Sequence, residues 1–312
     1  MIPNRLIFIW LGPKFPWSGG LAIRSAYQIQ KPSSLWLVHE GLKLEGDGWD
    51  LVKDIPGLEV IPVSDSHFEG LGDDGLCGKL FHTLTAPASR ANLLRLALLY
   101  KYGGVYLDTD IVMVKPFGKL MLQKGFVGTE PVALPASLFG SFNPLRWIFC
   151  GVQFAFREFC ARIPRGYGRF RRVEGLFTAA VNNAVIGSEP GNETISKAFG
   201  FIKTMPPEER LKRFRLGTRL LQKVTGNKSS DSMKVVNAKY FYPLGPEISA
   251  HWFKKNTRKR LNKLLRAETC VVHWYNSVEG RFLKTKLSRQ WVEDNPDTAF
   301  SELSRLTLQK GD

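Results

Sequence analysis

This sequence is short of cysteine and of long apolar runs, and each shortage excludes a class of protein. Its four cysteines, Cys77, Cys150, Cys160 and Cys270, form no C-x-x-C pair, so we expect neither a zinc site nor a disulfide framework. No stretch approaches the roughly 18 uninterrupted apolar residues of a membrane-spanning helix. The opening segment MIPNRLIFIWLG lacks the charged head, long apolar run and cleavage site of a signal peptide. We therefore expect a protein of the reducing cytoplasm.

The first half of the chain also lacks any excess of positive charge. Residues 1–139 hold 13 basic and 13 acidic residues, whereas residues 140–312 hold 31 basic and 15 acidic residues. The whole formal net charge of +16 therefore belongs to the second half. This asymmetry predicts an anionic partner, either nucleic acid or a membrane surface.

The first half has the alternating pattern of an α/β protein. Short apolar strand patterns at 6–10, 35–39 and 58–63 are separated by helical or turn-rich stretches. A helical pattern at 91–102 and strand patterns within 105–114 follow. This order predicts an open, mainly parallel central sheet with helices on both faces and ligands at the carboxyl ends of its strands.

The composition changes near residue 130, without an internal repeat or a low-complexity linker. Residues 136–172 are rich in aromatic residues and then in arginine, and the segments 210–223 and 254–266 are basic. We therefore expect two parts, residues 1–130 and 131–312, that complete a single catalytic domain.

Two carboxylates, Asp108 and Asp110, follow a helical pattern and a Gly-Gly turn. In a strand, side chains at i and i+2 point to the same face, so the pair is expected to converge at one spot. Hard divalent cations such as Mg²⁺ and Mn²⁺ prefer this arrangement of oxygens. A solvated surface turn is the alternative interpretation.

The preceding helical pattern carries two polar residues, Asn92 and Arg95, in an almost wholly apolar setting. Residues three apart share one helix face, and buried polar groups need partners. The guanidinium of Arg95 suits phosphate oxygens, sugar oxygens or a carboxylate. A narrow solvent-exposed face or a structural Arg–Asp pair is the alternative interpretation.

Several segments resemble one family. IFIWLG at 7–12 and NLLRLALLYKYGGVYLDTDIV at 92–112 resemble the DXD sugar-binding region of glycosyltransferases. The likeness is to α-1,4-glycosyltransferases related to lactosylceramide galactosyltransferase, to capsular polysaccharide and glycolipid sugar transferases and, more distantly, to the clostridial toxin glucosyltransferases. It continues in three further segments, at 181–199, 216–224 and 270–276.

The resemblance implies a nucleotide-diphospho-sugar transferase fold of the GT-A type and a retaining transfer of a hexose from a UDP-sugar. It implies that residues 1–130 bind the nucleotide sugar and that the basic part, 131–312, faces a saccharide or lipid-linked acceptor. The product would belong to surface polysaccharide, lipopolysaccharide or glycolipid synthesis.

The resemblance also implies which residues bind the donor. Trp10 would stack on the uracil. Asn92, Arg95 and Tyr106 would form the rest of the donor-binding set, with Asn92 and Arg95 on the sugar. Many relatives carry Asp at the position of Asn92, and an Asn there donates hydrogen bonds as well as accepting them.

The remaining implied roles are catalytic or metal-binding. Asp108 would contact the ribose or a metal-bound water, and Asp110 would ligate Mn²⁺ or Mg²⁺ directly. Asn183 would place an amide near the sugar and leaving group. His273 would be a further metal ligand, although a histidine among apolar neighbours can equally be a satisfied core residue.

Two other functions fit parts of the pattern. LDTDIV also matches the nucleophile motif of haloacid-dehalogenase-type phosphatases, but that motif normally lies on the first strand and needs a later acidic pair. No G-D-x-x-x-D follows Asp110. A nucleic-acid-binding protein would use the basic half, which carries no recognisable reading motif.

A membrane is the better partner for the basic half. Residues 136–172 and 252–266 mix Trp, Phe and Leu with Arg and Lys, as segments on anionic lipid do. In the second segment, Trp252, Phe253, Leu261, Leu264 and Leu265 are expected to form an apolar face. We therefore predict a peripheral enzyme at the inner face of the membrane; an ordinary basic helix packed on the core is the alternative.

Overall fold

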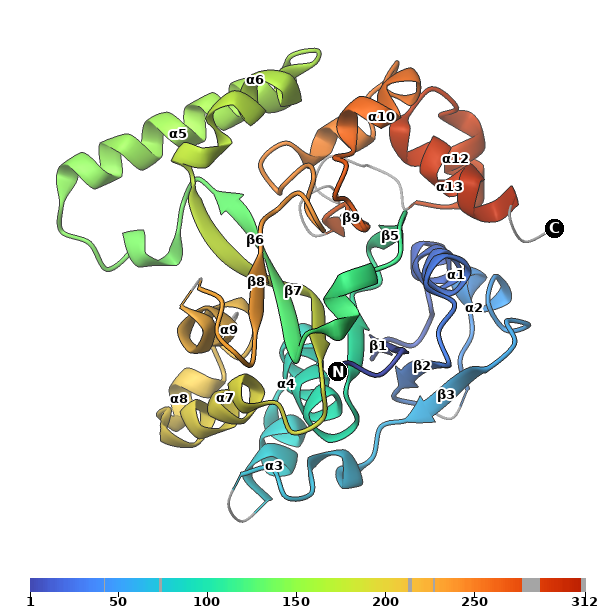
Figure 1. The fold of residues 1–312 in the computed structure, drawn as a ribbon, viewed down its shortest axis with the longest axis vertical. Helices are drawn as coiled ribbons and strands as arrows, with labels where there is room; N and C mark the ends of the chain where they lie inside the picture. The colour runs from blue at the N-terminus through green and yellow to red at the C-terminus, as the bar shows by residue number, and fades with distance from the viewer. Residues whose placement is uncertain (42, 73–74, 213–214, 227, 277–286, 310–312) are drawn as a thin grey trace. The chain divides into compact units, whose positions relative to one another are not determined.

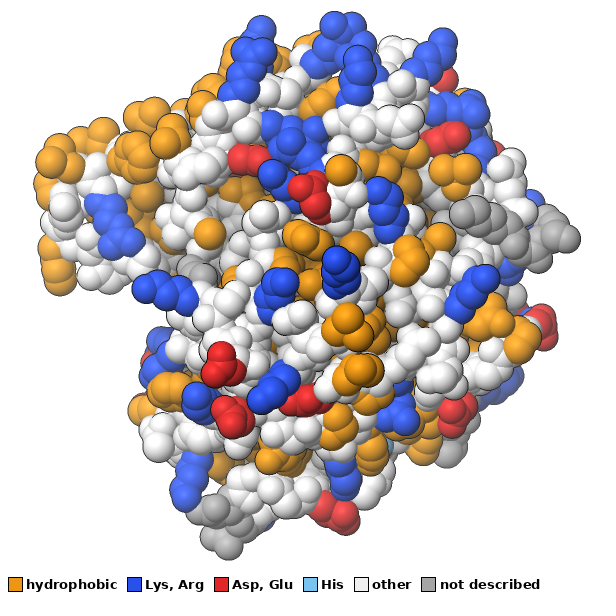
Figure 2. All heavy atoms as spheres, in the orientation of Figure 1, with side chains coloured by type: hydrophobic (Ala, Val, Ile, Leu, Met, Phe, Trp, Pro, Cys, Tyr) orange, Lys and Arg blue, Asp and Glu red, His pale blue; other side chains and the backbone are white. Residues whose placement is uncertain are grey.

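Two compact units form the fold in the computed structural model of the chain, which describes all residues except 42, 73–74, 213–214, 227, 277–286 and 310–312 (Figures 1 and 2). The first unit comprises Met1–Thr109, Pro116–Gly128 and Val181–Val236. The second comprises Asp110–Lys115, Thr129–Ala180 and Asn237–Asp312. The predicted division of labour at residue 130 stays a prediction.

A seven-stranded sheet organises the first unit, in the order β3-β2-β1-β4-β7-β6-β8 (Figure 1). The β3–β2, β2–β1, β1–β4 and β6–β8 pairs are parallel, whereas β4–β7 is antiparallel. The predicted α/β class with a mainly parallel sheet is therefore confirmed. The strands are β1 (Arg5–Trp10), β2 (Ser34–His39), β3 (Leu58–Pro62), β4 (Gly104–Leu107), β6 (Gly125–Val132), β7 (Thr178–Ser188) and β8 (Lys234–Val236).

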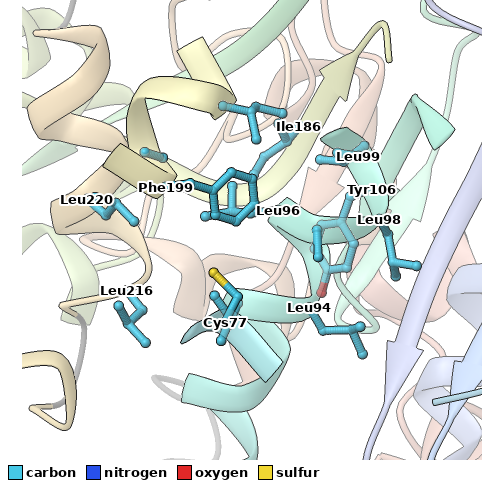
Figure 3. Close-up of a cluster of buried hydrophobic side chains, with 14 of the residues drawn as sticks. Cys77, Leu94, Leu96, Leu98, Leu99, Tyr106, Ile186, Phe199, Leu216 and Leu220 are labelled. Atoms are coloured by element: carbon cyan, nitrogen blue, oxygen red, sulfur yellow. The ribbon is translucent and has the colours of Figure 1, made fainter. Parts of the chain in front are cut away.

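Helix α4 (Pro87–Tyr102) is the central helix of this unit. Pro87 favours its start, because proline at the first turn loses no intrahelical hydrogen bond. Leucines on several sides of α4 are buried, and they pack with Tyr106 of β4, Ile186 of β7 and Phe199 of α7 (Figure 3). The other helices of the unit are α1 (Trp17–Gln30), α2 (Asp47–Asp50), α3 (Leu76–Thr83), α7 (Glu193–Thr204), α8 (Pro207–Arg210) and α9 (Thr218–Thr225), with 3-10 turns at Asp65–Phe68 and Gly118–Leu122.

A glycine pair ends α4 and starts β4. Gly103 and Gly104 have φ angles of 63° and 115°, which residues with side chains rarely adopt. A Cβ on Gly104 would also lie 2.7 Å from the carbonyl oxygen of Arg5. The two glycines therefore let the chain reverse tightly beside β1 and lead directly into the aspartates.

The second unit is built on a small antiparallel pair, β5 (Ile111–Met113) and β9 (Val271–His273). Ring contacts among Phe253, Trp274, Trp291 and Phe300 form an aromatic core. Its helices are α5 (Pro144–Arg162), α6 (Gly166–Val173), α10 (Leu261–Leu264), α12 (Arg289–Asp294) and α13 (Ala299–Gln309), with 3-10 turns at Ala136–Leu138, Glu174–Leu176, Ser249–Trp252 and Arg258–Arg260.

The structure corrects one half of the membrane prediction. Trp252 and Leu264 are fully buried, and Leu261 is also buried, so they cannot form an exposed apolar face on 252–266. The apolar side chains of this short segment are needed to cover the core of the second unit. The aromatic residues within 136–172 behave differently, because many of them are exposed.

Two further features concern membrane-spanning helices and cysteine pairing. Within the described residues, no helix has both the length and the apolar character that crossing a bilayer requires. All four cysteines are buried, and none of them is in a disulfide in the described part of the chain.

Candidate active site

The carboxyl ends of β1 and β4 bring the first group of candidate residues to one edge of the sheet. The two strands pair with Ile7 opposite Tyr106, so β1 ends at Trp10 on the same edge where β4 is followed by Asp108. This is the edge at which open parallel sheets bind ligands. The carbonyl of Trp10 lies 2.9 Å from Nδ1 of His39, at the end of the neighbouring strand β2.

A cavity of about 380 Å³ lies at this edge, beside the ends of β2 and β3. Its lining combines apolar side chains with polar ones, among them His39, Glu40, Asp65 and His82. Within it, His82 pairs with Asp65 at 2.7 Å, and Glu40 binds Arg90 of α4. The hydrogen bond from Arg90 is the largest cause of the lowered pKa of Glu40.

The structure corrects the expected placement of the two aspartates. Asp108 follows the last residue of β4, and Thr109–Asp110 form a turn before β5, so the pair does not share one strand face. β4 and β5 belong to different sheets. The chain must turn between them, and the Asp-Thr-Asp sequence provides that turn.

Arg95 is buried on α4 at the end of β4. Its Nη1 donates to the carbonyl oxygen of Asn183 at 2.5 Å and lies 3.4 Å from Oδ1 of Asp108. Its guanidinium stacks 4.2 Å from the ring centre of Tyr106, whose hydroxyl donates to the same Asp108 oxygen at 2.5 Å. Arg95 thus fixes a carboxylate, a ring and a strand carbonyl at once.

An amide pair lies beside this arginine. Nδ2 of Asn183 on β7 donates to Oδ1 of Asn92 at 2.8 Å. Asn92 is one α4 turn from Arg95, so both predicted polar residues of the helix point at the same residue of β7. Gly217, just before α9, closes over the pair: a Cβ there would lie 2.6 Å from Nδ2 of Asn92.

Asp110 and His273 come together in the second unit. Nε2 of His273 lies 3.0 Å from Oδ1 of Asp110, and the backbone N–H of Asn276 donates to its Oδ2 at 2.9 Å. Burial acts to raise the pKa of Asp110, but the facing histidine and these hydrogen bonds outweigh it and lower the pKa. The carboxylate is therefore held in its ionised form.

Tyr275 supports this pair from behind. Its φ of 59° is rare for a residue with a side chain, and this backbone turn comes directly before the Asn276 N–H that Asp110 accepts. Its ring centre lies 4.1 Å from that of His273, and its hydroxyl donates to Oε2 of Glu130 at 2.7 Å. Burial, followed by the charge of Glu130, raises the pKa of Tyr275 well above its usual range.

Comparison with known proteins identifies the class of site. Residues 50–127 match the family model "Glycosyltransferase sugar-binding region containing DXD motif". This part of the chain is similar to a glycosyltransferase sugar-binding region. The match includes Asn92, Arg95, Tyr106 and both aspartates, and it confirms the predicted resemblance and the predicted class of enzyme.

Curated relatives match this chain over parts of their length. "Glucan organizing enzyme 1" of Cryptococcus neoformans is 32% identical over 133 residues, which make up 43% of this chain and 32% of that protein. A protein of Arabidopsis thaliana is 42% identical over 55 residues, or 18% of this chain and 8% of that protein. The match thus spans about a third of the first relative and less than a tenth of the second.

Three solved glycosyltransferase structures are remotely similar to the chain. The PaToxG glycosyltransferase has a TM-score of 0.43 and 14% identity, covering 98% of this chain and 87% of its own. Mouse xyloside xylosyltransferase 1 has a TM-score of 0.46 and 12% identity, covering 88% and 98%. The galactosyltransferase LgtC, solved with donor and acceptor sugar analogs, has a TM-score of 0.41 and 10% identity, covering 98% and 95%.

The predicted site residues fall into two groups. The first unit holds Trp10, Asn92, Arg95, Tyr106, Asp108 and Asn183, and the second holds Asp110 and His273. Sequence reasoning assigned no role to Gly217, Glu130, Tyr275 or Asn276. Gly217 lies in the family-like segment 216–224, and Tyr275 and Asn276 lie in the family-like segment 270–276. The resemblance of these segments could have marked the three residues, but the sequence did not predict their contacts.

Replacing Gly217 with alanine is expected to lower kcat/KM for sugar transfer by about tenfold to a hundredfold, because the new Cβ displaces the amides of Asn92 and Asn183. Steady-state kinetics measure the effect. Gly200→Ala on α7 is the matched control, since a Cβ there meets nothing within 4 Å. Equal kinetics for both variants would show that the amide pair plays no part in turnover.

Proposed function

We propose that this chain is a metal-dependent, retaining glycosyltransferase that moves a hexose from a UDP-sugar to a saccharide or glycolipid acceptor. The observation that carries the proposal is the cluster of buried Arg95 and Asn92 with the partly buried Asn183 and Asp108 at the carboxyl end of β4. Such a convergence of donors and acceptors suits the many hydroxyls and the diphosphate of a nucleotide sugar.

The nucleotide is proposed to bind at the edge formed by β1, β2 and β4. Trp10 ends β1 there and offers a flat ring for the uracil. The cavity beside His39 lies at the same edge. The guanidinium of Arg95 already engages Asp108 and Asn183, so its role toward the donor is to position these groups as well as to add positive charge.

The residues present fit a divalent cation. Asp110 and His273 face each other within the second unit, and Asp108 comes two residues before Asp110 in the chain. Each of the three side chains offers a ligand atom, and carboxylates with one imidazole suit Mn²⁺ or Mg²⁺. When bound, the cation would neutralise charge on the departing diphosphate.

The amide pair is proposed to contact the sugar. Oδ1 of Asn92 already accepts from Asn183, which leaves its NH₂ as the group to offer a ligand. An aspartate at this position could only accept. Asn92 therefore selects a sugar oxygen that accepts a hydrogen bond, and Asn183 lies beside it to orient the leaving group.

The proposed acceptor is a saccharide or a glycolipid used in surface polysaccharide or lipopolysaccharide synthesis, at the cytoplasmic face of a membrane. The segment 136–172, which is basic and exposes many of its aromatic residues, supports a membrane-linked acceptor. Neither a phosphatase nor a nucleic-acid-binding protein explains the amide pair. The phosphatase motif would also lie on the first strand, whereas this D-x-D follows β4.

A panel of nucleotide sugars with Mn²⁺, scored by release of the free nucleoside diphosphate, tests the proposal. The expected result is release of UDP from one UDP-hexose above all others, with little turnover of ADP- or GDP-sugars. Turnover of none of the UDP-sugars, with or without candidate acceptors, would contradict it.

Replacing Trp10 with alanine is expected to raise the KM for the UDP-sugar about tenfold or more, because stacking on a base contributes about 1–3 kcal/mol. The KM for the acceptor should stay unchanged. Trp10→Phe keeps a flat ring and should recover most of the donor affinity. A donor KM that is the same in all three proteins would show that the base binds elsewhere.

A further inference from the structure

Helix α5 has its small and polar residues on the inside and its large apolar residues on the outside. Its buried side chains are Cys150, Gln153 and Cys160. Its outer stripe comprises Leu145, Ile148, Phe149 and Val152, which follow the i, i+3, i+4, i+7 spacing of one helix face and are 54–72% exposed. Figure 2 shows hydrophobic side chains gathered on the surface over this helix.

Polar contacts within the second unit fix this orientation of α5. Arg157 pairs with Glu247 at 2.8 Å, and Glu247 is buried and accepts from the backbone N–H of Ala133. Nε2 of Gln153 donates to the carbonyl oxygen of Leu176 at 2.7 Å. Turning the helix to hide its outer stripe would break these contacts and leave a buried charge unpaired, so the stripe stays outside.

Positive charge follows the stripe along the chain, at the carboxyl end of α5 and at α6. The segment 140–176 holds seven arginines and two glutamates. Four of the arginines lie exposed at the end of α5 and on α6: Arg162, Arg165, Arg169 and Arg172. Arg169 lies over the ring of Phe159, at 5.9 Å, so apolar and cationic groups meet on the surface.

We propose that this α5 surface, the stripe Leu145–Ile148–Phe149–Val152 with the four exposed arginines, binds an anionic lipid bilayer. A helix with an outward apolar face and flanking arginines can lie in the interface plane, with its apolar side chains among the acyl chains and its guanidiniums at the headgroups. The inference is independent of the proposed glycosyl transfer, because no residue of the α5 surface belongs to the candidate active site.

The charge is what favours a bilayer over a second copy of this chain. Two copies joined through the α5 surface would bring their clusters of like charge together, which costs free energy at an interface. An anionic bilayer instead offers apolar depth and negative charge over a wide area. Acidic partner proteins would supply charge but would need a matching apolar groove.

Sedimentation with vesicles tests the proposal on the full chain. Wild-type protein is expected to bind vesicles of phosphatidylcholine and phosphatidylglycerol at least about tenfold more tightly than vesicles of phosphatidylcholine alone. A quadruple variant carries Leu145→Ser, Ile148→Ser, Phe149→Ser and Val152→Ser. Its affinity for the anionic vesicles should be about tenfold or more lower than that of wild type. Leu122→Ser with Leu306→Ser, two exposed leucines outside the surface, is the control and should bind as wild type.

A charge variant separates the two contributions. Arg165→Glu, Arg169→Glu and Arg172→Glu together leave the apolar stripe unchanged. This triple variant should bind anionic vesicles about tenfold or more weakly than wild type and so lose its preference for them. Thermal unfolding checks that every variant is folded. Equal binding of wild type to both vesicle types would overturn the proposal. So would a dimer, seen by sedimentation velocity without lipid, that the serine variant abolishes while vesicle binding is absent.

Discussion

Replacing Asp110 with asparagine is expected to lower kcat for transfer from the UDP-sugar by about a thousandfold or more. The substitution keeps the side chain's shape and an acceptor for the N–H of Asn276, but it removes the negative charge that His273 and a divalent cation both need. Asp110→Ala should be equally inactive. UDP release measured over a range of Mn²⁺ concentrations gives the result.

The matched control is Asp50→Asn, which removes an exposed aspartate that pairs with Lys53 and is not one of the candidate site residues. Its activity should stay within a fewfold range of wild type. Undiminished turnover of Asp110→Asn, or of wild type in excess chelator, would contradict the metal-dependent assignment.

The second large effect is expected at Arg95. Arg95→Met should lower kcat/KM about a hundredfold or more and the free energy of unfolding by about 2 kcal/mol. Both losses have the same cause, because the guanidinium holds Asp108, Tyr106 and the carbonyl of Asn183 in place. Arg95→Lys keeps the charge but loses the planar fork, so it should recover stability better than activity.

Arg5 offers a closely matched control for this prediction. It also donates to a backbone carbonyl, that of Tyr102 at 2.8 Å, and stacks on a ring, Trp36 at 4.2 Å. It lies at the amino end of β1, away from the ligand-binding edge. Arg5→Met should therefore lose stability but retain activity, and equal activity losses in the two variants would reduce Arg95 to a structural residue.

Local sequence was enough to place the elements that build the edge of the sheet. The strands ending at Trp10 and His39 and the helix ending at Tyr102 match their apolar periodicity, and the Gly-Gly turn after the helix follows from backbone sterics. These features depend on neighbours in the chain. Periodicity and turn chemistry therefore determine them.

The sequence did not predict contacts between distant segments. A continuous β pattern around Asp108 and Asp110 hid the turn between two different sheets, because both flanking strands are buried and apolar. The segment 252–266 has the composition of an interfacial segment, yet its Trp252 and Leu264 are buried in the core of the second unit. The closure of Gly217 over Asn92 depends on a packing distance that no local pattern encodes.

The affinity of UDP with and without Mn²⁺ is the most direct test of the central claim, that the aspartates and His273 anchor a nucleotide diphosphate through a cation. Isothermal titration of the wild-type chain should show UDP binding at least about tenfold more tightly with Mn²⁺ than in excess chelator. The Asp110→Asn variant should lose that difference. An affinity for UDP that is the same with Mn²⁺ and with chelator would contradict the account.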